Sequence, residues 1–539
     1  MAKTLKYFVF GITSSLLAAI AYSYPEFGFL IWVAFIPFFW GLTRLNFSGK
    51  KIDGFLYGLI SGTAYFLLIF RWFWGLYPLD IYGIGSVMSI LIIGLLWLIT
   101  SASLGLFWGI FGLLTHILSK KRLFDFLFLG ALFSLLEFTR SFAINLTWYG
   151  QGALIGPHWT FGNPVYALSH SQFILTLSSY IGIYGLTFII ILFNLIAHNL
   201  IGRFLHKHHS FFWEKYLSII TLGLIILGIT IIKPVGLSKN DGREAENIRF
   251  SVIQTRQTSK ISDSPREILA NFHAQSELFL DAIRANESDV IIFPEGSNFF
   301  KNLSGFLKPA QIKNYFEKLS KNSKLIIDNS RINPEKKQMY SRVTYLNTKD
   351  DIIGYYDKKL LTPAGEFLPY SIEYLLKFIL GKNRQTLASI NRLKSGQDDR
   401  PAIFNNIVFE SAVCSDFFSP SIIRDKARKG AILIGMGSTA MFQGNKSLVS
   451  QNLAINRFRA AENQIPIVFA SNYGLSYVID VQGNTTKIAP NQDSQIFTGN
   501  VLVSTSKSWY NKLGDWPSLI LMLIILLAFL AKRACEQKN

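Results

Sequence analysis

Long runs of apolar residues fill the first 235 positions of the chain, and one more lies near its C-terminus. A helix of about 20 residues crosses the hydrocarbon core of a bilayer, and each of these runs reaches or approaches that length. The pattern predicts a polytopic α-helical membrane protein with about eight transmembrane helices. We expect them at 5–23, 27–43, 54–74, 84–118, 123–140, 172–200, 214–235 and 517–531.

Between about 241 and 508 the apolar runs are short and alternate with amphipathic segments, which predicts strands alternating with helices. Such an alternation is typical of a layered α/β domain. We therefore divide the chain into a membrane domain, 1–236, an inserted α/β domain, 237–511, and a last helix with its tail, 512–539. Strands are expected at 248–254, 289–293, 324–328, 407–413, 431–436, 466–471 and 476–480, and helices at 265–286, 309–321 and 447–463.

The composition supports a membrane protein, because 50% of the 539 residues are hydrophobic and only 16% are charged, against about 25% charged in a typical soluble protein. The net charge of +19 would suggest nucleic acid as a partner of a soluble protein. Here the basic residues gather in alternate loops, at 44–51, 120–122 and 203–215, and in the tail after 531. Because such loops stay in the cytoplasm, we expect cytoplasmic termini, an α/β domain on the outer side and no nucleic-acid partner. In a bacterium with two membranes, this describes an inner-membrane protein with a periplasmic domain.

The first apolar run allows two interpretations. Lys3 and Lys6, the apolar run and Ala19-Ile20-Ala21 resemble a secretory signal with its cleavage site. The alternative is a first membrane helix that is retained. In both cases the basic N-terminal end lies in the cytoplasm.

Three reactive side chains follow predicted strands. Glu295 ends the strand at 289–293, Cys414 ends the strand at 407–413, and Lys358 follows the extended segment at 352–357. Catalytic groups of α/β domains gather at strand ends. If they converge, they supply a thiol nucleophile, a carboxylate base and a cation for an oxyanion. Taken singly, each residue also has a structural explanation. Cys414 could be a buried thiol, Glu295 a helix cap and Lys358 part of a solvated strand end.

Other catalytic chemistries have weaker support. The two cysteines, Cys414 and Cys535, do not form a CxxC motif, and seven of the eight histidines lie in the membrane part. The eighth, His273, lies on a predicted amphipathic helix, where a surface histidine is the simpler interpretation. We therefore expect neither a metal nor another cofactor.

These residues resemble a known family. Phe293-Pro294-Glu295, Lys358 and Cys414 resemble the Glu-Lys-Cys constellation of the nitrilase superfamily. The stretch 358–369 (KKLLTPAGEFLP) resembles the apolipoprotein N-acyltransferases, the membrane-embedded members of that superfamily, and so do the apolar segments 24–39, 146–156 and 177–197. The resemblance implies that the periplasmic domain is an αββα sandwich.

The resemblance also implies roles and partners. Glu295 is then the general base, Lys358 the stabiliser of the tetrahedral oxyanion and Cys414 the nucleophile, with Glu366 and Asp416 as assisting carboxylates. The implied reaction moves an acyl chain from a membrane phospholipid to the cysteine as a thioester. The α-amine of the N-terminal diacylglyceryl-cysteine of an apolipoprotein then takes the chain as an amide. A lysine near Cys414 is expected to lower the pKa of the thiol.

Four positions depart from the family's pattern: Leu360, Ala364, Ser415 and Asp416 stand where histidine, phenylalanine, tyrosine and glutamate are usual. These changes bear on acyl-chain preference, rate and acceptor more than on reaction type. They leave room for a membrane-anchored amidase that hydrolyses small amides, and a catalytically degenerate binding protein is a second alternative. A transporter is disfavoured, because few ionisable residues lie in the apolar runs.

Overall fold

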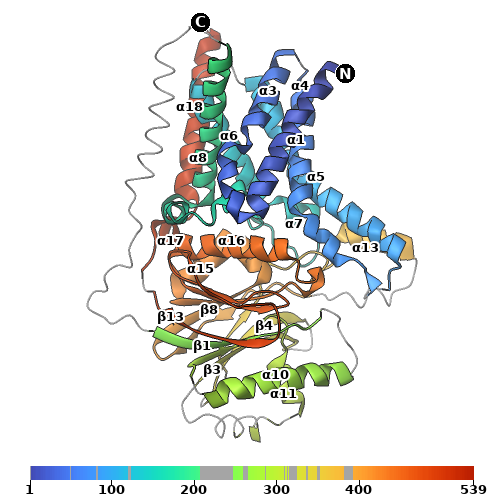
Figure 1. The fold of residues 1–539 in the computed structure, drawn as a ribbon, viewed down its shortest axis with the longest axis vertical. Coiled ribbons are helices and arrows are strands. Elements are labelled where there is room, and N and C mark those ends of the chain that lie inside the picture. The colour runs from blue at the N-terminus through green and yellow to red at the C-terminus, as the bar shows by residue number, and fades with distance from the viewer. Residues whose placement is uncertain are drawn as a thin grey trace.

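The computed structural model describes residues 2–206 and 247–538, apart from gaps at 49, 81–82, 119–122, 259–264, 286, 307, 309, 312–313, 315–323, 335–337, 349–351, 381–392 and 505. A bundle of long helices stands on a domain of two sheets, and both chain ends lie at the end of the bundle far from the sheets (Figure 1). The main helices of the bundle are α1 (Ala2–Ser23), α3 (Ile36–Ser48), α4 (Lys51–Ile69), α5 (Ser86–Leu118), α6 (Leu123–Arg140), α8 (Gln172–His206) and α18 (Trp516–Lys538).

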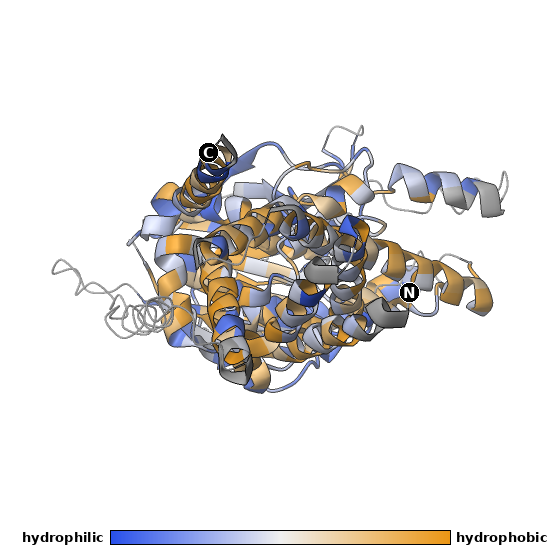
Figure 2. Cartoon of the chain, turned by 90° about the horizontal axis from the view of Figure 1, so that it is seen from above, coloured by the Kyte–Doolittle hydropathy of each residue, from blue (hydrophilic) through white to orange (hydrophobic). Residues whose placement is uncertain are grey.

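Five helical stretches in the described part of the chain are long and apolar enough to cross a membrane: Pro25–Leu45, Lys51–Ile69, Ser86–His116, Gln172–Gly202 and Trp516–Glu536. Seen from above, the bundle is largely hydrophobic (Figure 2). The predicted runs 5–23 and 123–140 also form helices, α1 and α6, but the apolar part of α1, Tyr7–Ser23, is shorter. The run 214–235 lies outside the described residues, so the predicted number of eight transmembrane helices is not confirmed.

Small residues let α4 and α5 pack with their backbones in contact. A Cβ atom on Gly58 would lie 2.0 Å from the carbonyl oxygen of Trp108, and one on Gly112 would lie 2.1 Å from that of Gly54. Both approaches are too close for any side chain. This is the packing that small residues allow between membrane helices, where van der Waals contact rather than water exclusion drives association.

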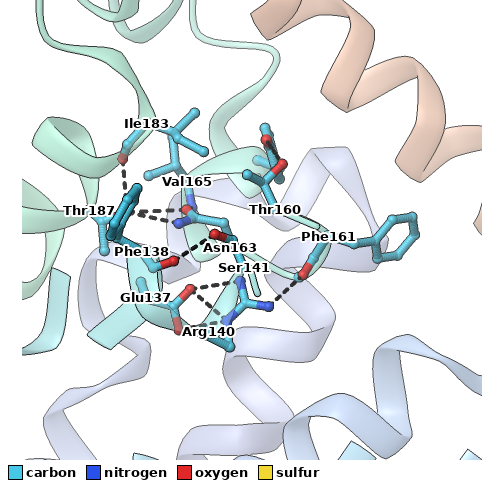
Figure 3. A network of polar contacts seen from close by, with 12 residues as sticks. Glu137, Phe138, Arg140, Ser141, Thr160, Phe161, Asn163, Val165, Ile183 and Thr187 are labelled. Carbon is cyan, nitrogen blue, oxygen red and sulfur yellow. Dashed lines mark hydrogen bonds and ion pairs between the residues drawn. The ribbon is translucent and has the colours of Figure 1, made fainter. Parts of the chain in front are cut away.

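The ionisable residues at the end of α6 form an internal pair (Figure 3). Arg140 Nη2 lies 2.8 Å from Glu137 Oε2, and Arg140 Nη1 donates to the carbonyl oxygen of Phe161 at 2.9 Å. In the same network, Asn163 Nδ2 donates to Thr187 Oγ1 on α8 at 3.1 Å. The buried charges are thus satisfied by the bundle itself, and they fix the loop that precedes α8.

The α/β domain contains two sheets. The seven-stranded sheet has the order β13-β1-β2-β3-β4-β5-β6, and the six-stranded sheet has the order β12-β11-β10-β9-β8-β7. The strands of the first are β1 (Asn247–Gln254), β2 (Val290–Ile292), β3 (Leu325–Ile332), β4 (Tyr340–Asn347), β5 (Ile352–Asp357), β6 (Asp399–Arg400) and β13 (Gln495–Leu502). Those of the second are β7 (Ala402–Phe404), β8 (Ile407–Val413), β9 (Ile432–Ser438), β10 (Ile467–Asn472), β11 (Tyr477–Ile479) and β12 (Thr485–Ile488).

The sheets pack face to face and helices cover both outer faces, which confirms the αββα sandwich. Side chains of both sheets, such as Val252 and Ile434, share one core. The outer face of the first sheet is covered by α10 (Pro265–Ala285) and α11 (Phe299–Phe306), and that of the second by α15 (Pro420–Lys429) and α16 (Lys446–Asn463). All seven predicted strands form, α10 and α16 match two predicted helices, and most of the third, 309–321, lies outside the described residues.

Helix α16 lies between the six-stranded sheet and the helical bundle (Figure 1). Gln451 on this helix accepts a hydrogen bond from Trp72 Nε1 at 3.0 Å and donates one to the carbonyl oxygen of Ile69 at 3.1 Å. The ring of Trp72 also meets Phe442 edge to face, with centroids 4.8 Å apart. These contacts join the α/β domain to the membrane helices through paired polar groups as well as apolar packing.

Candidate active site

Lys358 follows strand β5 and points into a buried cluster of carboxylates. Its Nζ lies 3.1 Å from Glu295 Oε1 and 2.9 Å from Glu366 Oε1, and the side chain is only 1% exposed. The other oxygen of Glu366, Oε2, accepts a hydrogen bond from the backbone N–H of Thr362 at 2.8 Å. The loop that follows Lys358 therefore folds back and brings Glu366 against the amine.

Cys414 lies at the end of β8, where the chain turns into a short 3-10 helix, Cys414–Phe418. Its φ of +49° places it in the left-handed region, which costs a residue with a side chain about 1–3 kcal/mol. Strained backbone of this kind clusters at functional sites. Beside the thiol lies a cavity between the strand ends of the six-stranded sheet and α16; Ser438, Asn452 and Tyr477 are among the residues that line it.

Asp416 holds the two halves of the site together. Its Oδ1 accepts from the backbone N–H of Leu360 at 2.8 Å, and its Oδ2 accepts from Tyr356 Oη at 2.7 Å and from the N–H of Val413 at 2.9 Å. One buried carboxylate thus joins the turn at Cys414 to the segment that carries Lys358. Asp416 does not bond to Lys358, so it is a positioning residue.

The charges of the cluster act on one another. Burial lowers the pKa of Lys358, but the carboxylates of Glu295 and Glu366 outweigh it, and the net pKa lies well above the usual value. Burial raises the pKa of Glu295; the amine of Lys358 opposes this rise and Glu366 adds to it. Glu295 is therefore a stronger base than an exposed glutamate, and Lys358 stays charged.

The thiol of Cys414 differs from the expectation. Burial raises its pKa, Glu295 raises it further, and Lys358 together with a backbone hydrogen bond from Ser438 only partly offsets the rise. Lys358 does lower the pKa of the thiol, as expected, but burial and the carboxylates of Glu295 and Glu366 outweigh it, so the net pKa is raised. The resting cysteine is a neutral thiol that needs a base to remove its proton.

Lys359, the next residue, belongs to a different group of charges. Its Nζ lies 3.7 Å from Asp399 Oδ2, and its side chain is 28% exposed. The buried amine of Lys426 contacts the same carboxylate and lies 2.7 Å from Glu410 Oε2. Neighbouring side chains of an extended segment point to opposite faces, and the two lysines do so here.

The structure thus brings together four of the five residues named from the sequence, Glu295, Lys358, Glu366 and Cys414, and places Asp416 behind them. The departures from the family pattern lie close by: Leu360 is fully buried, and the hydroxyl of Ser415 donates to its carbonyl oxygen. Sequence reasoning missed Tyr356, Asn452 and Tyr477. Within the described residues, no group of three or more His, Cys, Asp or Glu side chains could hold a metal ion.

Family models match both parts of the chain. Residues 250–511 match the family model of the carbon-nitrogen hydrolases, and residues 14–196 match that of the apolipoprotein N-acyltransferase N-terminal domain. The apolipoprotein N-acyltransferase of Geobacter metallireducens is 23% identical over 94% of this chain and 92% of its own. Apolipoprotein N-acyltransferase 1 of Treponema denticola is 22% identical over 97% and 96%. A solved structure, Saccharomyces cerevisiae Nit3 of the nitrilase superfamily, is 16% identical over 48% of this chain and 90% of its own, with a TM-score of 0.35.

The αββα domain, with its Glu-Lys-Cys cluster, is a carbon-nitrogen hydrolase domain. Its attachment to the membrane bundle sets it apart from a soluble nitrilase. Because both parts match in one chain and full-length relatives share the arrangement, the chain belongs to the apolipoprotein N-acyltransferase family.

Proposed function

We propose that this protein transfers an acyl chain from a membrane phospholipid, through a thioester on Cys414, to the α-amine of the N-terminal diacylglyceryl-cysteine of apolipoproteins. The observation that carries the proposal is the convergence of the cluster around Lys358 with the strained Cys414 beside a cavity. The names of the full-length relatives supply the acceptor class.

In the first half of the reaction, Glu295 accepts the proton of the Cys414 thiol, and the sulfur attacks the ester carbonyl of the phospholipid. The charged amine of Lys358 stabilises the tetrahedral oxyanion. When the carbon–oxygen bond breaks, the lysophospholipid leaves with the proton held by Glu295, and the acyl chain stays on sulfur. The raised pKa values of both groups support this order, because a neutral thiol needs a base and a glutamate of raised pKa binds a proton more readily.

In the second half, the acceptor amine attacks the thioester carbonyl. Glu295 takes a proton from the amine, Lys358 again stabilises the oxyanion, and the carbon–sulfur bond breaks to give the amide. The thiolate then takes the proton from Glu295, and the site returns to its resting state. A thioester is readily attacked by an amine, so the cysteine divides one difficult transfer into two easier steps.

Membrane attachment suits substrates that are lipids. We propose that both termini lie in the cytoplasm of a bacterium, that the bundle is in the inner membrane and that the domain 237–511 is in the periplasm. The distribution of basic loops supports this orientation. A reporter fused near residue 348 should read periplasmic and one in the loop 44–51 cytoplasmic, whereas a cytoplasmic reporter at 348 would contradict the orientation.

The test of function uses the purified full-length protein in detergent, a phospholipid with a labelled acyl chain and a synthetic diacylglyceryl-cysteine peptide. Label should move to the peptide, and blocking the peptide's α-amine by acetylation should prevent the transfer. Release of free fatty acid at the same rate with and without the peptide would instead indicate a hydrolase. Turnover of small soluble amides without phospholipid would have the same meaning and would overturn the proposal.

A further inference from the structure

A second pocket lies where the last helix leaves the α/β domain. It is lined by Arg424 and Arg428 of α15, Lys512 and Leu513 of α17 (Trp509–Leu513), and Trp516 and Ile520 of α18. None of these residues lines the cavity beside Cys414. The pocket combines three cations with large apolar side chains at the start of a membrane-spanning helix.

Two of the three cations form no ion pair within the part of the chain that the structure describes. Arg428 donates from Nε to the carbonyl oxygen of Asn511 at 3.0 Å and from Nη2 to that of Lys512 at 2.6 Å, so it holds α17 in place. Neither Arg424 nor Lys512 forms an ion pair within the described residues, and Arg424 Nε is a buried donor that lacks a hydrogen-bond partner there. A buried unpaired donor costs free energy, so an acceptor in the pocket would be bound favourably.

The backbone is shaped to admit the guanidinium of Arg424. A Cβ atom on Gly514, which has a φ of +69°, would lie 1.5 Å from Arg424 Nη1. Only glycine allows both this conformation and this approach. The nearby carboxylate of Asp515 accepts a hydrogen bond from Tyr510 at 3.2 Å. Burial raises the pKa of Asp515 and the charge of Arg424 partly offsets the rise, but the two groups form no ion pair.

The pocket lies at the start of α18, at the level expected for the headgroup region of a bilayer. Trp509 and Trp516 are each 64% exposed, and tryptophan is enriched at the membrane–water interface. Beyond Trp516, the exposed apolar side chains of Ile520 and Ile524 continue along α18, a helix long enough to cross a membrane. A ligand with a negative head at the cations and apolar chains along α18 would match the whole surface.

We propose that this pocket binds the headgroup phosphate of an anionic phospholipid from the leaflet next to the α/β domain. Arg424 and Lys512 donate to the phosphate oxygens, and the acyl chains lie along α18. Arginine pairs with phosphate through two parallel hydrogen bonds, and basic pockets beside membrane helices suit anionic headgroups. The bound lipid would fix α15 and α18 to the bilayer surface, and this role is independent of the acyl transfer at Cys414.

The test is native mass spectrometry of the full-length protein in detergent, titrated with diether phosphatidylglycerol. Ether-linked chains cannot be transferred, so the lipid stays intact during the titration, and the variants separate this site from the acyl-donor site. The double variant Arg424→Gln/Lys512→Gln should bind the lipid about tenfold more weakly or worse, equivalent to about 1.4 kcal/mol or more. A matched control, Arg284→Gln/Lys301→Gln, removes two exposed cations from α10 and α11, at the opposite end of the domain from the bundle (Figure 1), and should bind like the parent protein.

Competition identifies the ligand. Diether phosphatidylcholine and millimolar inorganic phosphate should each fail to displace the bound phosphatidylglycerol. Displacement by phosphatidylcholine would overturn the anionic class, and displacement by inorganic phosphate would show a site for free phosphate. The single variant Lys512→Gln, at an exposed position, keeps the test valid if the double variant does not fold, and it should bind severalfold more weakly. Parent-like lipid binding by these variants would overturn the proposal.

Discussion

Two buried lysines in the α/β domain hold similar partners and yet differ in what they can do. Lys358 lies between Glu295 and Glu366, and Lys426 lies between Asp399 and Glu410. Both amines are nearly inaccessible, at 1% and 2% exposed. The two groups of charges also receive neighbouring residues of the chain. Lys358 belongs to the first group, and Lys359 contacts Asp399 of the second.

The difference lies in what borders each group. Cys414, which also lines a cavity, lies beside the first group. In the second group, the amine of Lys426 lies 3.9 Å from the centroid of the Tyr356 ring, and its ion pair with Glu410 joins α15 to β8. Glu410 is 1% exposed, and burial raises the pKa of its carboxyl although Lys426 opposes the rise. A lysine with two carboxylates is therefore not a catalytic signature by itself. It becomes a candidate site where a nucleophile lies beside it, as Cys414 does here.

The largest effect that would test this contrast is on stability. Lys426→Met should lower the free energy of unfolding by about 3–5 kcal/mol, because it leaves the buried carboxylate of Glu410 without its cation. The folded fraction should keep its turnover rate. Thermal unfolding in detergent and activity per folded molecule measure the two quantities. The double variant Lys426→Met/Glu410→Gln removes the unpaired charge as well and should recover much of the lost stability.

The complementary change should affect the rate. Lys358→Met should slow acyl transfer at least about a hundredfold, equivalent to about 2.7 kcal/mol, the scale of losing one oxyanion donor. Lys358→Arg should also fail, because a guanidinium fork does not replace a compact ammonium. Lys359→Met is the matched control and should cost little, since its amine is partly solvated. A dead Lys359→Met with an active Lys358→Met would reverse the assignment of the two groups.

A smaller effect concerns the pH dependence of the first group. Glu295 must be ionised to act as a base, so the rate should rise with pH through its raised pKa. Glu366 contributes to that rise, so Glu366→Gln should lower the pKa of Glu295 and move the acidic limb of kcat/KM to lower pH, by about one unit or less. Glu277→Gln, on the exposed face of α10, is the control and should leave the limb unchanged. A shift of the limb to higher pH in Glu366→Gln would contradict the arrangement of charges.

The sequence predicts best those strands whose side chains are buried on both faces. Strands buried on both faces, such as β8 and β10, are mostly apolar and were found almost to the residue. β4 was missed because burial alternates along it and its polar side chains interrupt the pattern, and β12 was missed because it is mostly exposed. Pairing with a neighbouring strand, which the local sequence does not encode, stabilises such elements.

The candidate site was predictable as far as strand ends and the family resemblance indicate it. Glu295, Lys358 and Cys414 each follow a strand, so their types and order suggested a site before any distance was known. The hydrogen bonds of Asp416, and the cavity side chains Asn452 and Tyr477, depend on packing between segments far apart in the chain. The raised pKa of the Cys414 thiol was missed for the same reason, because burial is a property of the assembled domain.

The most direct test of the account is to look for the acyl group on the enzyme. The full-length protein is incubated with phospholipid in the absence of acceptor and digested, and the peptides are weighed by mass spectrometry. The account predicts an added acyl mass on the peptide that contains Cys414, lost on treatment with hydroxylamine and absent from Cys414→Ser, while Cys535→Ser still acquires it. An acyl group on Cys535, or on neither cysteine while transfer proceeds, would contradict the central claim that Cys414 is the nucleophile.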